Sequence, residues 1–137
     1  MATVLEEKEA IREVASRYCF LVDGGRFEEW VKLFADDGVF EIIGAKPRVG
    51  HEAILALIRS LPTNEKGLPG FKHCVMNDVI EVAGETARAQ WYLLLLRDGK
   101  PIQVEVAGRY EDKLVKRGGH WLFQERKVYF DFGRPGT

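Results

Sequence analysis

Cysteine is scarce in this sequence, which has only Cys19 and Cys74 and no CxxC pair. Disulfide frameworks and thiolate metal sites need more cysteines at closer spacing, so we expect reduced thiols and a cytoplasmic location. The first residues, MATVLEEKEA, are acidic and lack the apolar core of a secretory signal. The longest strongly apolar run, residues 91–96, is far too short to cross a bilayer, so no membrane association is expected.

An excess of positive charge is also missing, because 20 Lys and Arg face 21 Asp and Glu, a net charge of -1. Nucleic acid is therefore not an expected partner. The sequence has no glycine-rich phosphate loop, no GxSxG and no HxxxH. These absences predict that the protein uses no metal and no cofactor.

The 137 residues suit one domain, residues 1–137, whose first half reads as three helices. Thr3 and Glu6 form a capping box that starts the first helix, which ends at Asp23 before Gly24-Gly25. The inward stripe of this helix is expected to contain Ile11, Val14, Ala15, Tyr18, Leu21 and Val22.

Two further helices are predicted before the loop at residues 62–70. The second carries Phe27, Trp30, Val31 and Phe34 on one stripe and is expected to stop at a turn, residues 36–38. The third begins near residue 50, and Pro62 ends it.

Strands account for the rest of the pattern. A short strand is expected at 39–42, and four longer ones at 71–82, 86–97, 102–115 and 120–132 read as an antiparallel meander. Helices followed by a meander predict an α+β fold with a curved antiparallel sheet wrapped around three helices.

His73 is the histidine in the most informative position. It lies in phase with Phe71, Val75 and Asn77, on a strand face that looks buried. A core histidine with satisfied hydrogen bonds is one interpretation. The other is that His73 meets Asp23, a carboxylate beside an apolar helix face where an unused charge is costly. Such a pair would make His73 a general base.

Two more polar side chains fall within apolar patterns. The Tyr18 hydroxyl lies in the middle of the first helix's apolar stripe and needs a buried partner. Arg126 interrupts an apolar strand, and a salt bridge to a surface acid is its simplest explanation. The aromatic residues Trp30, Phe34, Trp91 and Tyr129 could be core residues or walls of a pocket.

Several segments together resemble the SnoaL-like group of the NTF2-like superfamily. They are Y-C-F-L-V-D-G-G-R-F-E-E-W-V-K-L-F-A-D-D-G-V-F at 18–40, G-H-E-A-I at 50–54, H-C-V-M-N at 73–77, E-T-A-R-A at 85–89, G-R-Y-E-D at 108–112 and W-L-F-Q-E-R-K-V at 121–128. The resemblance implies a cone-shaped, cystatin-like fold with an internal pocket. This fold hosts enzymes and non-enzymes alike.

Within that superfamily the pattern looks most like scytalone dehydratase, bile-acid 7α-dehydratase and hexachlorocyclohexane dehydrochlorinase. The resemblance implies that Asp23 orients His73, that His73 is the base, and that Tyr18 binds a substrate oxygen. It also implies that Arg126 stabilises developing negative charge. Glu105, the candidate for an acid on a later strand, is expected on the polar face.

The predicted function is therefore a cofactor-independent lyase or isomerase for a small apolar, cyclic or carbonyl-bearing metabolite. The expected substrate pocket contains Trp30, Phe34, Asn77, Trp91 and Tyr129. The alternatives are a non-catalytic ligand-binding module and a structural partner like the small β subunit of aromatic-ring dioxygenases. We also expect a homo-oligomer, dimer or trimer, formed through a sheet face that exposes Trp121 and Phe123.

Overall fold

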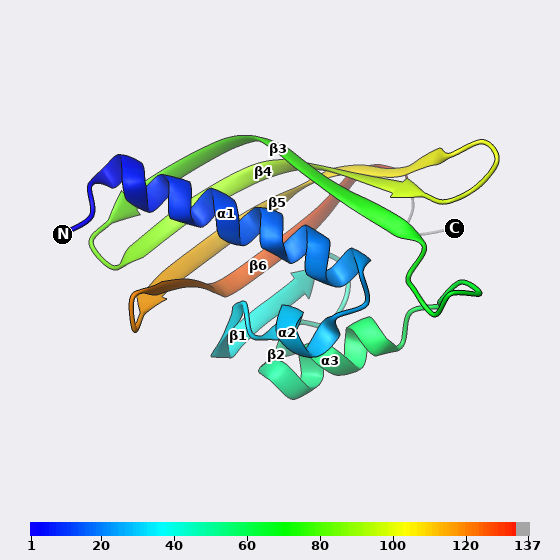
Figure 1. The fold of residues 1–137 in the computed structure, drawn as a ribbon, viewed down its shortest axis with the longest axis horizontal. Coiled ribbons are helices and arrows are strands. Elements are labelled where there is room, and N and C mark those ends of the chain that lie inside the picture. The colour runs from blue at the N-terminus through cyan, green and yellow to red at the C-terminus, as the bar shows by residue number, and fades with distance from the viewer. Residues whose placement is uncertain (134–137) are drawn as a thin grey trace.

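A six-stranded sheet with a long helix across one face forms the centre of the fold, and the computed structural model describes residues 1–133 (Figure 1). The helices are α1 (Val4–Asp23), α2 (Phe27–Val31) and α3 (His51–Arg59). The strands are β1 (Phe34–Ile42), β2 (Arg48–Val49), β3 (Phe71–Ala83), β4 (Thr86–Arg97), β5 (Gln103–Arg117) and β6 (His120–Gly133). The α+β architecture with a curved sheet is confirmed.

The strand order is β2-β1-β6-β5-β4-β3, so the four long strands form the expected meander. Neighbours pair antiparallel except β1 and β6, which run parallel, a pairing that the sequence analysis did not predict. In Figure 1, α1 crosses the sheet while α2 and α3 lie together beside β1 and β2. None of the helices in residues 1–133 is long and apolar enough to span a membrane.

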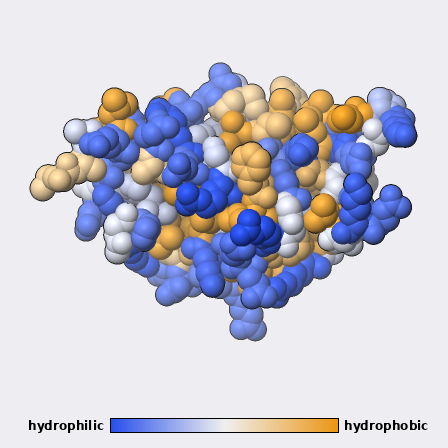
Figure 2. Space-filling model, viewed as in Figure 1, coloured by the Kyte–Doolittle hydropathy of each residue, from blue (hydrophilic) through white to orange (hydrophobic). Residues whose placement is uncertain are grey.

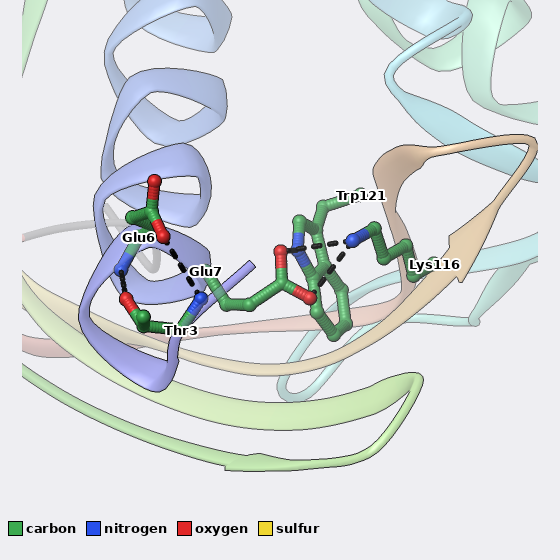
Figure 3. A network of polar contacts seen from close by, with 5 residues as sticks. All are labelled: Thr3, Glu6, Glu7, Lys116 and Trp121. Carbon is green, nitrogen blue, oxygen red and sulfur yellow. Dashed lines mark hydrogen bonds and ion pairs between the residues drawn. The ribbon is translucent and has the colours of Figure 1, made fainter. Parts of the chain in front are cut away.

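The capping box at the start of α1 is present as predicted. The Thr3 hydroxyl accepts from the Glu6 backbone N–H at 3.1 Å, and the Glu6 carboxylate accepts from the Thr3 N–H at 2.9 Å (Figure 3). All six residues of the predicted inward stripe are buried.

The second helix is shorter than predicted, because α2 ends at Val31 and Phe34 already belongs to β1. The predicted turn at 36–38 is a bulge within that strand, where the pairing with β6 shifts between Phe34 and Val39. Gly38 fits this bulge because a Cβ there would lie 2.9 Å from the Ala35 carbonyl oxygen and 3.0 Å from that of Phe123. The apolar residues of segment 27–34, which have helical spacing, therefore belong to two elements, the short helix α2 and the start of the buried strand β1.

The prediction that Trp121 and Phe123 are exposed is wrong, since they are only 3% and 0% exposed. Their strand changes phase: Trp121 and Phe123 are buried, and so are Arg126 and Val128. The β5–β6 pairing shifts between Lys113 and Leu114, which supplies the extra residue. Strict alternation along the strand cannot anticipate such a shift.

Glu7 joins the first turn of α1 to the β5–β6 hairpin. Its carboxylate accepts two hydrogen bonds from Lys116 Nζ, at 3.0 and 2.9 Å, and one from Trp121 Nε1 at 3.3 Å (Figure 3). The Lys116 bond, with help from Trp121, holds the pKa of Glu7 below its ordinary 4.5. The helix is thereby fixed to the sheet at the end opposite Asp23.

We expect Glu7→Gln to lower the midpoint of thermal unfolding at pH 7. A carboxyl whose pKa is lower in the folded state stabilises the fold above its ordinary pKa, so the gap to wild type should close as pH falls below about 4.5. Glu9→Gln is the matched control, because Glu9 lies on the same helix and its side chain is 74% exposed. Calorimetry between pH 3 and 8 measures both, and a gap independent of pH would contradict the expectation.

Candidate functional site

A cavity of about 250 Å³ lies between the inner face of the sheet and the three helices. Most of its lining is apolar, including Val22 of α1, Trp30 of α2 and Leu93 of β4. The polar residues in the lining are Tyr18, His73, Arg97, Glu105 and Tyr110. On the face that carries α1, hydrophilic residues dominate the surface and hydrophobic residues are visible between them (Figure 2). A small apolar molecule with a few polar atoms matches such a lining.

The structure brings Asp23 and His73 together at one side of this cavity. Asp23 is the last residue of α1, and His73 is the third residue of β3. Asp23 Oδ1 lies 2.7 Å from His73 Nδ1, while Oδ2 accepts the His73 backbone N–H at 2.9 Å. The two side chains are only 16% and 11% exposed. Both carboxylate oxygens thus hold one residue, which fixes the position of β3 and of the imidazole ring together.

The end of α1 makes this contact possible. Gly24 closes the helix with a hydrogen bond to the Phe20 carbonyl, and Gly25 follows with φ 74°. That left-handed conformation favours glycine and turns the chain away from the axis of α1 directly after Asp23. Asp23 is therefore the last residue of the helix. Ideal helix spacing could not establish that Asp23 reaches the side of the cavity where Tyr18 lies.

The Asp23 contact also decides which imidazole nitrogen is available for chemistry. A carboxylate at Nδ1 favours a proton on that nitrogen, which leaves Nε2 as the acceptor in the neutral ring. Nε2 has no hydrogen-bond partner among residues 1–133, and the His73 ring lines the cavity. An imidazole held in this tautomer can take a proton from a bound molecule.

Two buried tyrosines, Tyr18 and Tyr110, lie close to the His73 side of the cavity. The Tyr18 ring centroid is 6.1 Å from that of His73 and 5.8 Å from that of Tyr110. Burial raises the pKa of Tyr18, although the positive charge of Arg126 partly offsets this. Burial also raises the pKa of Tyr110, well above its ordinary value. Both phenols therefore stay protonated at neutral pH and can donate hydrogen bonds.

Arg126 lies behind these two rings, and it is not part of the cavity lining. It is 0% exposed, and its guanidinium carbon is 3.7 Å from the Tyr110 ring centroid and 4.4 Å from that of Tyr18. Its Nε and Nη2 donate to Asp112 at 2.8 and 2.9 Å, and Asp112 also accepts from Trp91 Nε1 at 2.8 Å. The partner of Arg126 is thus a buried acid, where the sequence suggested a surface one.

Of the predicted pocket residues, the structure places one in the cavity lining and the other four elsewhere. Trp30 lines the cavity, whereas Phe34 and Trp91 are buried in the core without lining it. Asn77 is exposed, with φ 57°, at a bulge where the β3–β4 register shifts, so it leaves the inward phase that strict alternation gave it. Tyr129 lies outside the cavity lining, and its ring packs under Arg109, whose guanidinium carbon is 4.0 Å from the ring centroid.

Arg97 and Glu105 were missed as cavity residues. Their side chains form a two-point ion pair, with Nε–Oε1 and Nη2–Oε2 both 2.7 Å. Glu105 turns inward because the β4–β5 register shifts between Leu95 and Leu96, which leaves Val104 63% exposed instead. Tyr110 and Asp112 could have been found from the sequence, because both alternate with Leu114 on one strand face.

Two buried donors have no hydrogen-bond partner among residues 1–133, namely Trp30 Nε1 and Arg126 Nη1. The Cys19 thiol is buried nearby, and burial raises its pKa to about 12, so it is not a nucleophile at neutral pH. Within the described residues, no group of three or more His, Cys, Asp and Glu side chains could hold a metal ion.

Comparison with known proteins gives a family and a set of relatives. The family described as the SnoaL-like domain matches residues 3–127. The β subunit of the methanesulfonate monooxygenase hydroxylase from Methylosulfonomonas methylovora is 26% identical over 149 residues, covering 93% of this chain and 82% of that subunit.

Solved structures show the same fold. An NTF2-like protein with a cystatin-like fold from Novosphingobium aromaticivorans has a TM-score of 0.84 at 25% identity, covering 96% of this chain and 86% of that one. A candidate scytalone dehydratase from the same organism has a TM-score of 0.78 at 24% identity, covering 90% and 83%. At this identity the second likeness concerns the fold alone.

The buried ion pair generates a stability prediction. Arg126→Met leaves the Asp112 charge buried without its partner, so we expect it to lower the free energy of unfolding by about 3–5 kcal/mol. Combining it with Asp112→Leu removes both charges and should restore much of that loss. Arg109→Met, which breaks half-exposed ion pairs on the same strand as Asp112, should cost about 1 kcal/mol or less. Urea unfolding measures all three, and equal losses for the Arg126 and Arg109 variants would contradict the prediction.

Proposed function

The chain belongs to the SnoaL-like domain family of the NTF2-like superfamily, and from that premise we propose that it is a cofactor-independent lyase or isomerase. Its substrate is a small apolar metabolite, cyclic or carbonyl-bearing. The observation that carries the proposal is the Asp23–His73 pair, whose imidazole lines an apolar cavity. Catalysis begins when His73 Nε2 removes a proton from a substrate carbon.

Asp23 contributes to this step through charge and orientation. As Nε2 takes the proton, the imidazole becomes positively charged, and the carboxylate at 2.7 Å stabilises that charge. The backbone N–H of His73 donates to the other oxygen of the same carboxylate at 2.9 Å, which holds the carboxylate in place beside the ring. Asp23 thus acts on the substrate through His73.

The apolar lining contributes binding and the exclusion of water. Trp30, Phe71 and Leu93 would surround the carbon framework of the substrate, so the base faces a carbon instead of bulk water. The proton on His73 can then return to a leaving hydroxide, which gives a dehydratase, or to another carbon, which gives an isomerase. A departing halide would leave as the anion, and His73 would then release its proton to solvent.

A panel of apolar ring compounds bearing a carbonyl, hydroxyl or halide group, incubated in D₂O and followed by NMR, tests the proposal. Wild type should release a product or exchange a carbon-bound proton with at least one compound. His73→Ala should lower that rate by about 10²–10⁴-fold, the usual contribution of a positioned base. Asp23→Asn should lower the rate by a smaller factor, because the amide oxygen can still accept from His73 Nδ1 but lacks the negative charge of the carboxylate.

His120→Ala is the matched control, because His120 lies exposed in the β5–β6 hairpin. Its rate should equal that of wild type. A His73→Ala variant that is as active as His120→Ala would rule out His73 as the base.

A second function is favoured by one observation, the likeness to a hydroxylase β subunit. In this alternative the chain is a structural partner of a larger, iron-containing oxygenase chain, and its cavity is not a catalytic site. Affinity purification from the native source distinguishes the two, since the alternative requires a stable complex with such a chain. A ligand-binding module without turnover would instead bind panel compounds and leave them unchanged.

Self-association and cellular location complete the proposal. We expect a homo-oligomer, dimer or trimer, in the cytoplasm. Because Trp121 and Phe123 are buried, they cannot supply the contact. Exposed apolar side chains elsewhere, such as Tyr92 of β4 and Phe132 of β6, are available for it. Light scattering on the purified chain measures the oligomeric state.

A further inference from the structure

Trp30 is a cavity residue whose polar atom the proposed base leaves unexplained. Its indole N–H is buried and has no hydrogen-bond partner among residues 1–133. The other two indoles of the chain are both hydrogen-bonded. Trp91 Nε1 donates to Asp112 at 2.8 Å, and Trp121 Nε1 donates to Glu7 at 3.3 Å. A buried donor without a partner is costly, so its place beside a cavity calls for an explanation.

The position of Trp30 indicates what could serve as its acceptor. Trp30 belongs to α2, is 1% exposed and lines the cavity. Its ring packs against those of Tyr18, Phe34 and Phe40, with centroids 5.4, 5.6 and 6.3 Å away. An aromatic face is a weak acceptor for an N–H group, so these rings do not replace an oxygen. A molecule bound in the cavity can supply that oxygen.

The surroundings of Trp30 determine the kind of acceptor that suits it. An indole N–H is a donor only, so the ligand atom must be an acceptor. A carboxylate among aromatic rings would lose its hydration without gaining an ion pair, because Arg97 of the lining is already held by Glu105 through two contacts of 2.7 Å. A neutral oxygen, as in an ether or an ester, loses much less on leaving water.

We propose that Trp30 Nε1 donates a hydrogen bond to a neutral oxygen of the substrate, separate from the group that reacts at His73. The substrate is then an apolar ring compound with an additional ether-like or ester-like oxygen. This assignment rests on the proposed function, because it takes the cavity ligand to be the substrate of His73. The Tyr18 ring centroid is 5.4 Å from that of Trp30 and 6.1 Å from that of His73, so one ring compound can reach both.

Two probes of the same shape, 1,4-dimethoxybenzene and 1,4-diethylbenzene, test the assignment without turnover. Each ether oxygen of the first replaces a CH₂ group of the second, so only the first offers acceptors. In ¹⁵N-tryptophan-labelled wild type, the Trp30 indole proton should move downfield with 1,4-dimethoxybenzene and not with 1,4-diethylbenzene. Trp91 and Trp121 are internal controls, because their hydrogen bonds lie within the protein, and their signals should be alike in the two complexes.

Trp30→Phe extends the test from the NMR signal to affinity. Loss of one net hydrogen bond should weaken the binding of 1,4-dimethoxybenzene, relative to that of 1,4-diethylbenzene, by about fivefold. Phe40→Leu is the matched control, because Phe40 lines the cavity and packs against Trp30 but has no polar side-chain atom. Its ratio of the two affinities should equal that of wild type. The NMR comparison uses wild type alone, so it does not depend on the stability of either variant.

The assignment is overturned if wild type binds neither probe, if the Trp30 signal is the same in both complexes, or if Trp30→Phe keeps the wild-type ratio of affinities. An identical Trp30 signal in both complexes would mean that a water molecule or the packing alone accounts for the buried donor.

The outcome is separable from that of the proposed function. A Trp30 signal that ignores the ether oxygen, together with lost turnover in His73→Ala, would overturn the Trp30 assignment and leave proton abstraction standing. A Trp30 signal that responds to the ether oxygen, together with unchanged turnover in His73→Ala, would keep the oxygen contact and remove the base.

Discussion

The contact between Asp23 and His73 joins the end of α1 to the start of β3, across 50 positions of sequence. Placing a carboxylate where it is largely withdrawn from water is costly, and this one compensates through two hydrogen bonds to a single residue. The contact holds the helix at one end, while Glu7 holds its other end to the β5–β6 hairpin. A helix fixed at both ends keeps a constant distance from the sheet, which preserves the cavity between them.

The second buried charge, Arg126, depends on the same arrangement. Its guanidinium is stacked among the rings of Tyr18 of α1, Tyr110 of β5 and Phe123 of β6. These contacts therefore require α1 to keep its position against the sheet. The ion pair with Asp112 offsets the cost of burying the Arg126 charge. The indole N–H of Trp91 donates a further hydrogen bond to the Asp112 carboxylate. A buried ion pair adds little net stability over packed apolar residues, whereas removing one partner leaves a costly unpaired charge.

Much of the fold could be predicted from local chemistry, because the capping box of Thr3 and the hairpins depend on neighbouring residues. Asp23 and His73 could be suggested as candidates because each is polar in an apolar pattern, but only the tertiary structure shows that they meet. The wrong predictions for Asn77 and Glu105 follow from bulges, which shift the inward-facing phase of a strand by one residue. Asn77 therefore faces away from the cavity, and Glu105 faces into it. Phe34 was misassigned because a short apolar run suits helix and buried strand equally.

The protonation of the His73 ring tests the central claim most directly, because the contact with Asp23 must determine which nitrogen carries the proton. Heteronuclear NMR of ¹⁵N-labelled protein at pH 8 distinguishes the two nitrogens by their chemical shifts and by coupling to ring hydrogens. We predict a neutral ring that carries its proton at Nδ1 and has an unprotonated Nε2. The chemical shift of Nε2 should change when a ligand binds in the cavity. A neutral ring protonated at Nε2 would contradict the account.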